Sequence, residues 1–236
     1  GEYTLGMAEF ERELIELGRA NGKRGGYVQF ATAAGKESED RLNYWQELGK
    51  QQAERIGVEC KFVPLFDKVG VNNPQFRELV KDASLIYFSG GNPVHLAQTL
   101  HGTDLLKAIK DEFASGTSLA GCSAGAMAMA EEASIHWRKN KESHDGFGIL
   151  PRMKIFPHYD RYFGNIPSPI RSFITKSRDE EFSIGIDENT ALLWNKEGWS
   201  VRGVGNIHLL GSHKNEDKNR FNNGENLNFL PTPVIN

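Results

Sequence analysis

One serine in this sequence, flanked by small residues, is a candidate nucleophile. Ser123 is the centre of Gly-Cys-Ser-Ala-Gly at residues 121–125, a G-x-S-x-G pattern. An apolar stretch precedes it and an alanine- and methionine-rich stretch follows, which predicts a strand, a sharp turn and a helix. Such a turn strains the serine backbone and exposes its hydroxyl at the carboxyl edge of the sheet. The alternative is an ordinary turn in which Ser123 only caps the helix.

A second glycine-rich turn could supply an oxyanion hole. The sequence Ser-Gly-Gly-Asn-Pro at residues 89–93 ends another predicted strand, and its glycines let backbone amides approach a ligand closely. Attack on a carbonyl needs one amide donor after the nucleophile and one from a neighbouring loop. The spacing therefore predicts an oxyanion hole made by the amides of Gly91 and Ala124. The competing interpretation is an ordinary Gly-Asn-Pro turn.

A serine nucleophile needs a base, and His158 is the histidine best placed to serve. It follows the predicted strand at residues 153–156, with Pro157 stiffening the approach, whereas His95 and His101 are expected on a surface helix. The base in turn needs a carboxylate that holds its tautomer. The spacing leaves three carboxylates open as that partner: Asp160, Asp187 and Glu188.

Alternating strands and helices must position these residues. Short apolar runs followed by amphipathic stretches predict parallel strands joined by helical crossovers, with a crevice at the carboxyl ends of the strands. After Gly185 the strands become short and punctuated by turns, which predicts a small antiparallel extension. The predicted strands are 26–34, 58–66 and 84–91, and the predicted helices are 39–57, 74–83 and one or two within 93–115.

Length and composition favour one α/β domain over residues 1–236 that acts on a small molecule. The chain has 236 residues, 39% of them hydrophobic, and a formal net charge of -3, which gives no general attraction to nucleic acid or to an anionic membrane. Its two cysteines, Cys60 and Cys122, are too few for a disulfide framework. We expect a cytoplasmic monomer or homodimer without metal or cofactor. A sheet of this kind normally opens with a strand, whereas this sequence begins in a predicted turn, so two alternatives stay open: the first strand is missing from the N-terminus, or this sheet never had one.

Taken together, the motifs resemble those of a known family of serine peptidases. Gly-Cys-Ser-Ala-Gly-Ala, Tyr-Phe-Ser-Gly-Gly-Asn, Pro-His-Tyr-Asp and Gly-Ile-Asp-Glu-Asn, in this order, are similar to those of peptidase family S51, which includes aspartyl dipeptidase (peptidase E) and cyanophycinase. The resemblance implies a fold like that of class I glutamine amidotransferases and a serine-histidine-glutamate triad. Carried over by position, the triad is Ser123, His158 and Glu188, with Asp160 as the competing acid. A glutamine amidotransferase would carry cysteine at position 123, so Cys122 is interpreted as a packing residue.

The resemblance also implies a substrate and the residues that bind it. The dipeptidase branch hydrolyses the bond after an N-terminal aspartate, through an acyl-enzyme. An arginine after the histidine is expected to pair with the aspartate, and Arg171 lies at a matching offset, with Arg161 as a second candidate. Asn92 is a further candidate for contact with the substrate. The alternatives are a cyanophycinase-like hydrolase of aspartyl-arginine linkages and a catalytically silent binding module on the same fold.

Overall fold

Two four-stranded sheets form the framework of the molecule. The structure is a computed structural model, and it describes residues 3–135, 142–163, 166, 175, 180–211 and 218–234. The first sheet has the strand order β2-β1-β3-β4 and all its pairs are parallel. Its strands are β1 (Tyr27–Phe30), β2 (Cys60–Val63), β3 (Leu85–Phe88) and β4 (Ser118–Gly121).

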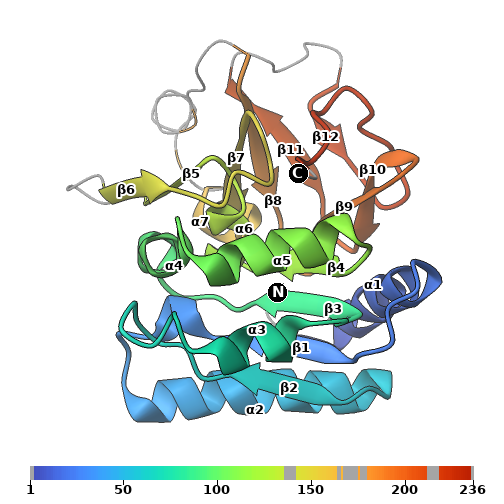
Figure 1. The fold of residues 1–236 in the computed structure, drawn as a ribbon. Helices are drawn as coiled ribbons and strands as arrows, with labels where there is room; N and C mark the ends of the chain where they lie inside the picture. The colour runs from blue at the N-terminus through green and yellow to red at the C-terminus, as the bar shows by residue number, and fades with distance from the viewer. Residues whose placement is uncertain are drawn as a thin grey trace.

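Helices cover both faces of the first sheet (Figure 1). Because successive side chains of a strand point to opposite faces, Tyr27 and Val28 of β1 belong to different hydrophobic clusters. On the Tyr27 face pack α1 (Ala8–Ala20) and α2 (Glu39–Ile56). On the Val28 face pack α3 (Pro74–Val80), α4 (Pro93–Leu100) and α5 (Asp104–Ala114). The short helices that remain are η1 (Leu5–Met7), η2 (Thr32–Ala34), α6 (Ala124–Ala128) and α7 (Tyr159–Tyr162).

Local sequence signals explain where these helices begin and end. The side chain of Asn73 accepts a hydrogen bond from the amide of Gln75 at the start of α3, and Thr103 caps α5 in the same way. Pro74 stands at the first position of α3, where a missing amide proton costs nothing. Helix α2 stops at Gly57, whose φ of 75° is a left-handed conformation that glycine adopts freely.

The second sheet has the order β12-β11-β8-β7 and mixes both strand directions. Strand β7 (Met153–Pro157) runs parallel to β8 (Phe182–Ile186), while β11 (Ile207–Leu210) pairs antiparallel with both β8 and β12 (Arg220–Phe221). Two antiparallel pairs complete the fold: β9 (Thr190–Asn195) with β10 (Gly198–Gly203), and β5 (Glu132–Ile135) with β6 (Glu142–Asp145).

The expected fold class is confirmed, with one refinement in how the sheets divide. The predicted parallel strands, the helices on both faces and the antiparallel C-terminal strands are all present, and the stretch after Pro93 forms two helices. Among the described strands, however, β4 pairs only with β3, so the two sheets are not joined by a backbone ladder.

Candidate active site

Ser123 occupies a strained turn between β4 and α6. Its φ of 48° and ψ of -110° are unfavourable for a residue with a side chain. Ser123 is the N-cap residue of α6, yet its side chain makes no capping hydrogen bond. The strain therefore does not serve helix capping, in contrast to the simpler interpretation. Helix α6 is only five residues long, so the first-turn amides rather than a long helix dipole would stabilise negative charge beside Ser123.

The two glycines of the motif allow the turn to pack against β3. A Cβ on Gly125 would lie 2.2 Å from the carbonyl oxygen of Phe88, and one on Gly121 would lie 2.4 Å from the carbonyl carbon of Gly125. Both positions therefore require glycine for steric reasons. The amide of Cys122 donates to the same Phe88 carbonyl, which fixes the turn at the carboxyl end of β3. The buried side chain of Cys122 belongs to the core on the Tyr27 face, as expected of a packing residue.

His158 and Glu188 lie in hydrogen-bond contact at the carboxyl ends of β7 and β8. These strands pair in parallel with Pro157 opposite Ile186, so the residues that follow them emerge side by side. The Nδ1 atom of His158 lies 3.1 Å from Oε1 of Glu188. His158 has a left-handed backbone with φ of 50° and is the N-cap of α7. Because Nδ1 is engaged, Nε2 is the nitrogen that could take a proton from a nucleophile.

Two hydrogen bonds keep the carboxyl of Glu188 ionised, which is the form that can orient a histidine. Burial of the carboxyl would by itself raise its pKa, but hydrogen bonds from Arg161 and His158 outweigh burial and hold the pKa of Glu188 below its usual value. Arg161 donates through Nη1 to the same Oε1 atom, at 3.2 Å. Glu188 is therefore ionised at neutral pH and can orient and stabilise an imidazolium.

Asp160, the competing candidate for the acid role, contacts the backbone of Glu188. Its Oδ1 accepts a hydrogen bond from the backbone amide of Glu188, at 3.0 Å. This contact ties the loop that carries Glu188 to α7, which begins directly after His158. Asp160 thus holds the backbone of Glu188, while the carboxylate of Glu188 contacts His158. The assignment of the acid role itself stays a prediction.

The loop that contains Gly91 is fixed against η2. Gly91 has φ of 135°, and a Cβ there would lie 2.5 Å from the carbonyl of Ala33, so only glycine fits. The next amide, of Asn92, donates to that carbonyl. The Oδ1 atom of Asn92 accepts from the amide of His95 as the cap of α4. The Nδ2 donor of Asn92 suits a substrate carbonyl or carboxylate, and the second lone pair of Oδ1 can accept from a substrate amine.

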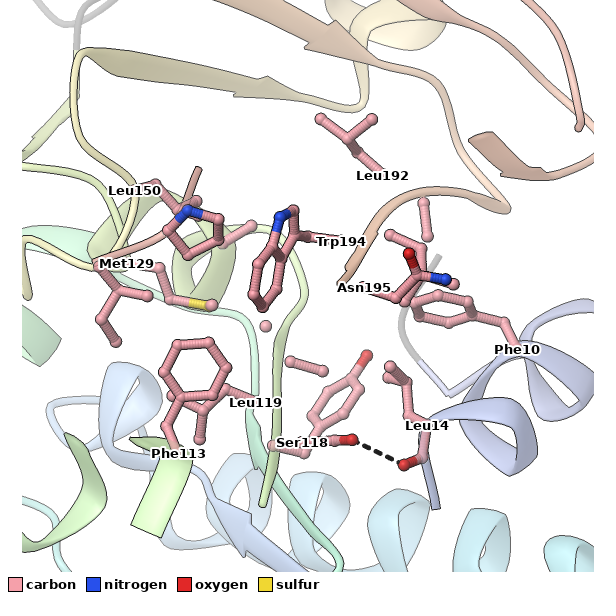
Figure 2. A pocket seen from close by; sticks show the side chains of 18 of the residues that line it. Phe10, Leu14, Phe113, Ser118, Leu119, Met129, Leu150, Leu192, Trp194 and Asn195 are labelled. Carbon is pink, nitrogen blue, oxygen red and sulfur yellow. Dashed lines mark hydrogen bonds between the residues drawn. The ribbon is translucent and has the colours of Figure 1, made fainter. Parts of the chain in front are cut away.

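A cavity of about 610 Å³ is lined by Ser123 and His158 and by residues of β4 and β9. Pro157, next to His158, also lines it. Every residue of 117–123 and of 190–197 lines the cavity, and since successive side chains alternate between faces, the cavity runs along the edges of β4 and β9. Figure 2 shows Phe10, Leu14, Phe113 and Trp194 around it. Apolar side chains thus make up much of the wall of the cavity that Ser123 lines.

Of two further expectations, one is wrong and the other concerns a residue outside the described part of the chain. His95 does not lie on a surface helix: it is buried, and its Nε2 lies 2.7 Å from the carbonyl oxygen of Phe66. It was misplaced because seven of the eight residues of α4 are buried, so this helix has only a narrow exposed face. Arg171, the expected partner of a substrate carboxylate, lies outside the described residues, and its position stays a prediction.

Sequence reasoning did not single out the contacts that surround Glu188. It left Asp187 as one of three candidate acids and did not connect His208 to the site. The structure places these two side chains in contact, with Nε2 of His208 2.9 Å from Oδ1 of Asp187. A cross-strand contact between residues 21 positions apart gives no local signal. The adjacent acidic pair at 187 and 188 is the only hint that the sequence offers.

Within the described part of the chain, no group of three or more histidine, cysteine, aspartate or glutamate side chains could hold a metal ion. A search of the same residues for a helix long and apolar enough to cross a membrane also finds none.

Comparisons with known proteins show what the whole chain is similar to. Residues 8–202 match the model of peptidase family S51. Peptidase E from Nostoc sp. is 29% identical over 205 residues, covering 79% of this chain and 76% of the relative. Cyanophycinase from Geminocystis herdmanii is 26% identical, covering 64% of this chain and 58% of the relative.

Two solved structures are similar in fold. The crystal structure of a peptidase from an acI-B1 Actinobacterium is 43% identical, covers 97% of this chain and 93% of its own, and superposes with a TM-score of 0.86. A putative peptidase E from Listeria monocytogenes shares 20% identity and a TM-score of 0.58, covering 82% of this chain and 95% of its own. The second similarity concerns the fold alone.

Proposed function

The chain belongs to peptidase family S51, and from this premise we propose that it is a cytoplasmic serine exopeptidase that hydrolyses the peptide bond after an N-terminal residue, preferably aspartate. The observation that supports this proposal most strongly is the His158–Glu188 hydrogen bond, because His158 and Ser123 line the same cavity. A strained serine, a histidine and an ionised glutamate are the parts that acyl transfer to a hydroxyl requires.

The residues would share the reaction as follows. The Oγ atom of Ser123 attacks the substrate carbonyl, and its proton passes to Nε2 of His158 while Glu188 stabilises the imidazolium. The amides of Gly91 and Ala124 hold the oxyanion. The imidazolium then gives its proton to the leaving amine, and the peptide bond breaks to leave an acyl-enzyme. Water, deprotonated by His158, releases the acid and restores Ser123.

Arginine side chains are the proposed readers of the substrate aspartate. Arg161 is the described candidate: its side chain is 66% exposed, so it can contact a substrate while it pairs with Glu188. Bidentate pairing of a guanidinium with a carboxylate would distinguish aspartate from uncharged residues. Arg171 and the Nδ2 donor of Asn92 complete the proposed set.

A panel of dipeptides tests the proposal. Aspartyl-leucine, leucyl-leucine, N-acetyl-aspartyl-leucine and a β-aspartyl-arginine dipeptide are incubated with the protein, and released amino acids are quantified. We expect hydrolysis of aspartyl-leucine, with Ser123→Ala lowering turnover by roughly six orders of magnitude. Preferred cleavage of the β-aspartyl-arginine linkage would instead support the cyanophycinase-like alternative, since one relative is a cyanophycinase. Binding without hydrolysis of any substrate would support the silent module.

A further inference from the structure

The carboxylate beside Glu188 is buried and fully engaged in hydrogen bonds. Asp187 is 6% exposed. Its Oδ2 accepts from the backbone amide and the side-chain amide of Asn206, at 2.9 and 3.0 Å, and its Oδ1 contacts Nε2 of His208 at 2.9 Å. A buried carboxylate that loses one of these donors is strongly destabilised. The direction of the Asp187 side chain, and with it the start of the Glu188 loop, is therefore fixed.

His208 also contacts Tyr159, the residue that follows His158 in the chain. The rings of Tyr159 and His208 lie with centroids 4.5 Å apart. Tyr159 reaches His208 across β8 at Gly185, where a Cβ would lie 2.7 Å from the tyrosine ring. His208 stands opposite Gly185 in the β8–β11 ladder. The glycine thus leaves the space in which the two rings meet.

We propose that His208 is a positioning residue for the catalytic pair, an inference that rests on the proposed function. His208 is joined to Asp187, directly before Glu188, and to Tyr159, directly after His158. It therefore couples the two loops that set the separation between His158 and Glu188. His208 touches neither the substrate nor the reacting atoms in this scheme. Because misplacement of a catalytic group by about 1 Å can cost on the order of 100-fold in rate, this coupling matters for activity.

Two substitutions separate the two contacts of His208. His208→Phe keeps an aromatic ring against Tyr159 but removes the donor to Asp187, whereas His208→Gln keeps an amide donor near the position of Nε2 and removes the ring. Each is tested by the labelling rate of Ser123 with an alkyl fluorophosphonate. In that reaction an Oγ–P bond forms, the P–F bond breaks, fluoride leaves and the hydroxyl proton passes to His158.

We expect His208→Phe to label on the order of 10- to 100-fold more slowly than the wild type, and His208→Gln to recover most of the rate. In dipeptide hydrolysis the loss should fall on kcat and leave KM little changed, since substrate contacts are intact. In a Glu188→Gln background His208→Phe should have almost no further effect, because residues that act as a unit are not additive. Tyr27→Phe is the matched control, because it removes a buried hydrogen bond to the carboxyl of Glu11 on α1 and leaves the loops that carry His158 and Glu188 unchanged, so it should label normally.

Three results would overturn the inference. His208→Phe could label as fast as the wild type, or it could slow labelling by the same factor in the Glu188→Gln background as in the wild type. The third is a loss of labelling rate in Tyr27→Phe as large as that in His208→Phe. If His208→Phe does not fold, Asp187→Asn replaces it, because it keeps the shape of the side chain while weakening the contact; an undiminished rate in that variant also overturns the inference. Failure of the wild type itself to label at Ser123 would instead contradict the proposed function.

Discussion

At the scale of single residues, Asp160 and Glu188 are separated by what each carboxylate contacts. Glu188 accepts from the imidazole of His158, and Asp160 accepts from the backbone amide of Glu188. We expect Glu188→Gln to lower kcat/KM by on the order of 10⁴-fold, because an amide cannot stabilise an imidazolium as a carboxylate does. Asp160→Asn should cost far less, since its amide oxygen still accepts the same backbone proton. Steady-state kinetics on an aspartyl dipeptide compares the two, and the reverse ranking would move the acid role to Asp160.

Arg161 links the pH dependence of activity to the carboxylate of Glu188. Burial raises the pKa of Glu188, hydrogen bonds from Arg161 and His158 lower it below its usual value, and the one from Arg161 lowers it most. Arg161→Met removes it, so the pKa of Glu188 should rise and the carboxylate should become protonated at a higher pH. The acidic limb of the kcat/KM profile should then shift to higher pH.

The measurement for Arg161 uses a dipeptide with an uncharged first residue, so that loss of aspartate recognition does not contribute. Arg152→Met is a suitable control, because Arg152 pairs with Glu180 at a distance of 3.8 Å rather than with Glu188. An acidic limb that stays in place in Arg161→Met, or that moves equally in both variants, would contradict the role of Arg161 in setting the pKa of Glu188.

At the scale of elements, β4, the strand that leads to the candidate nucleophile Ser123, has only one neighbour among the described strands. The amides of Ser118 and Cys122 donate to the carbonyls of Ser84 and Phe88 on the β3 side. Since donors alternate between the two edges of a strand, the amides of Leu119 and Gly121 point toward the cavity between β4 and β9.

This geometry predicts an alternating pattern of hydrogen exchange along β4. The amides of Leu119 and Gly121 should exchange at least about tenfold faster than that of Ala120, because exchange of the latter requires opening of the β3–β4 ladder. Residue-resolved exchange by NMR measures this, with β3, paired on both edges, as the internal control. Uniform protection along β4 would show that its outer edge is covered.

The elements differ in how far the sequence predicts them. The strand, turn and helix around Ser123 follow from local composition, because Gly121 and Gly125 are required by contacts that the turn itself creates. Helix 39–57 follows from its apolar periodicity and ends at Gly57. The gap beside β4 and the contact of His208 with Asp187 depend on pairing between distant strands, which no local pattern encodes. His95 shows the same limit, because its burial depends on what packs around α4.

At the scale of the whole molecule, a buried carboxyl group on α1 links stability to pH. Glu11 is 1% exposed and accepts hydrogen bonds from Tyr27 and Gln52, at 3.0 and 3.1 Å. Burial raises the pKa of Glu11 to about 7, only partly opposed by these two hydrogen bonds. In the unfolded chain the same carboxyl keeps its ordinary value near 4.5. The folded protein therefore binds this proton more tightly than the unfolded chain does.

The sign of the resulting pH dependence follows from linkage. Between pH 4.5 and 7 the folded state holds more protons at Glu11, so the free energy of unfolding falls as the pH rises and levels off above 7. The difference corresponds to about 3 kcal/mol at most. Glu11→Gln lacks this titration, so its stability relative to the wild type should improve by about 2 to 3 kcal/mol from pH 5 to pH 8. Denaturant unfolding at both pH values measures the change, with the exposed Glu9→Gln on the same helix as the control. A relative stability of Glu11→Gln that does not change with pH would mean that Glu11 is ionised in the folded protein, stabilised by the nearby charge of Arg55 despite its burial.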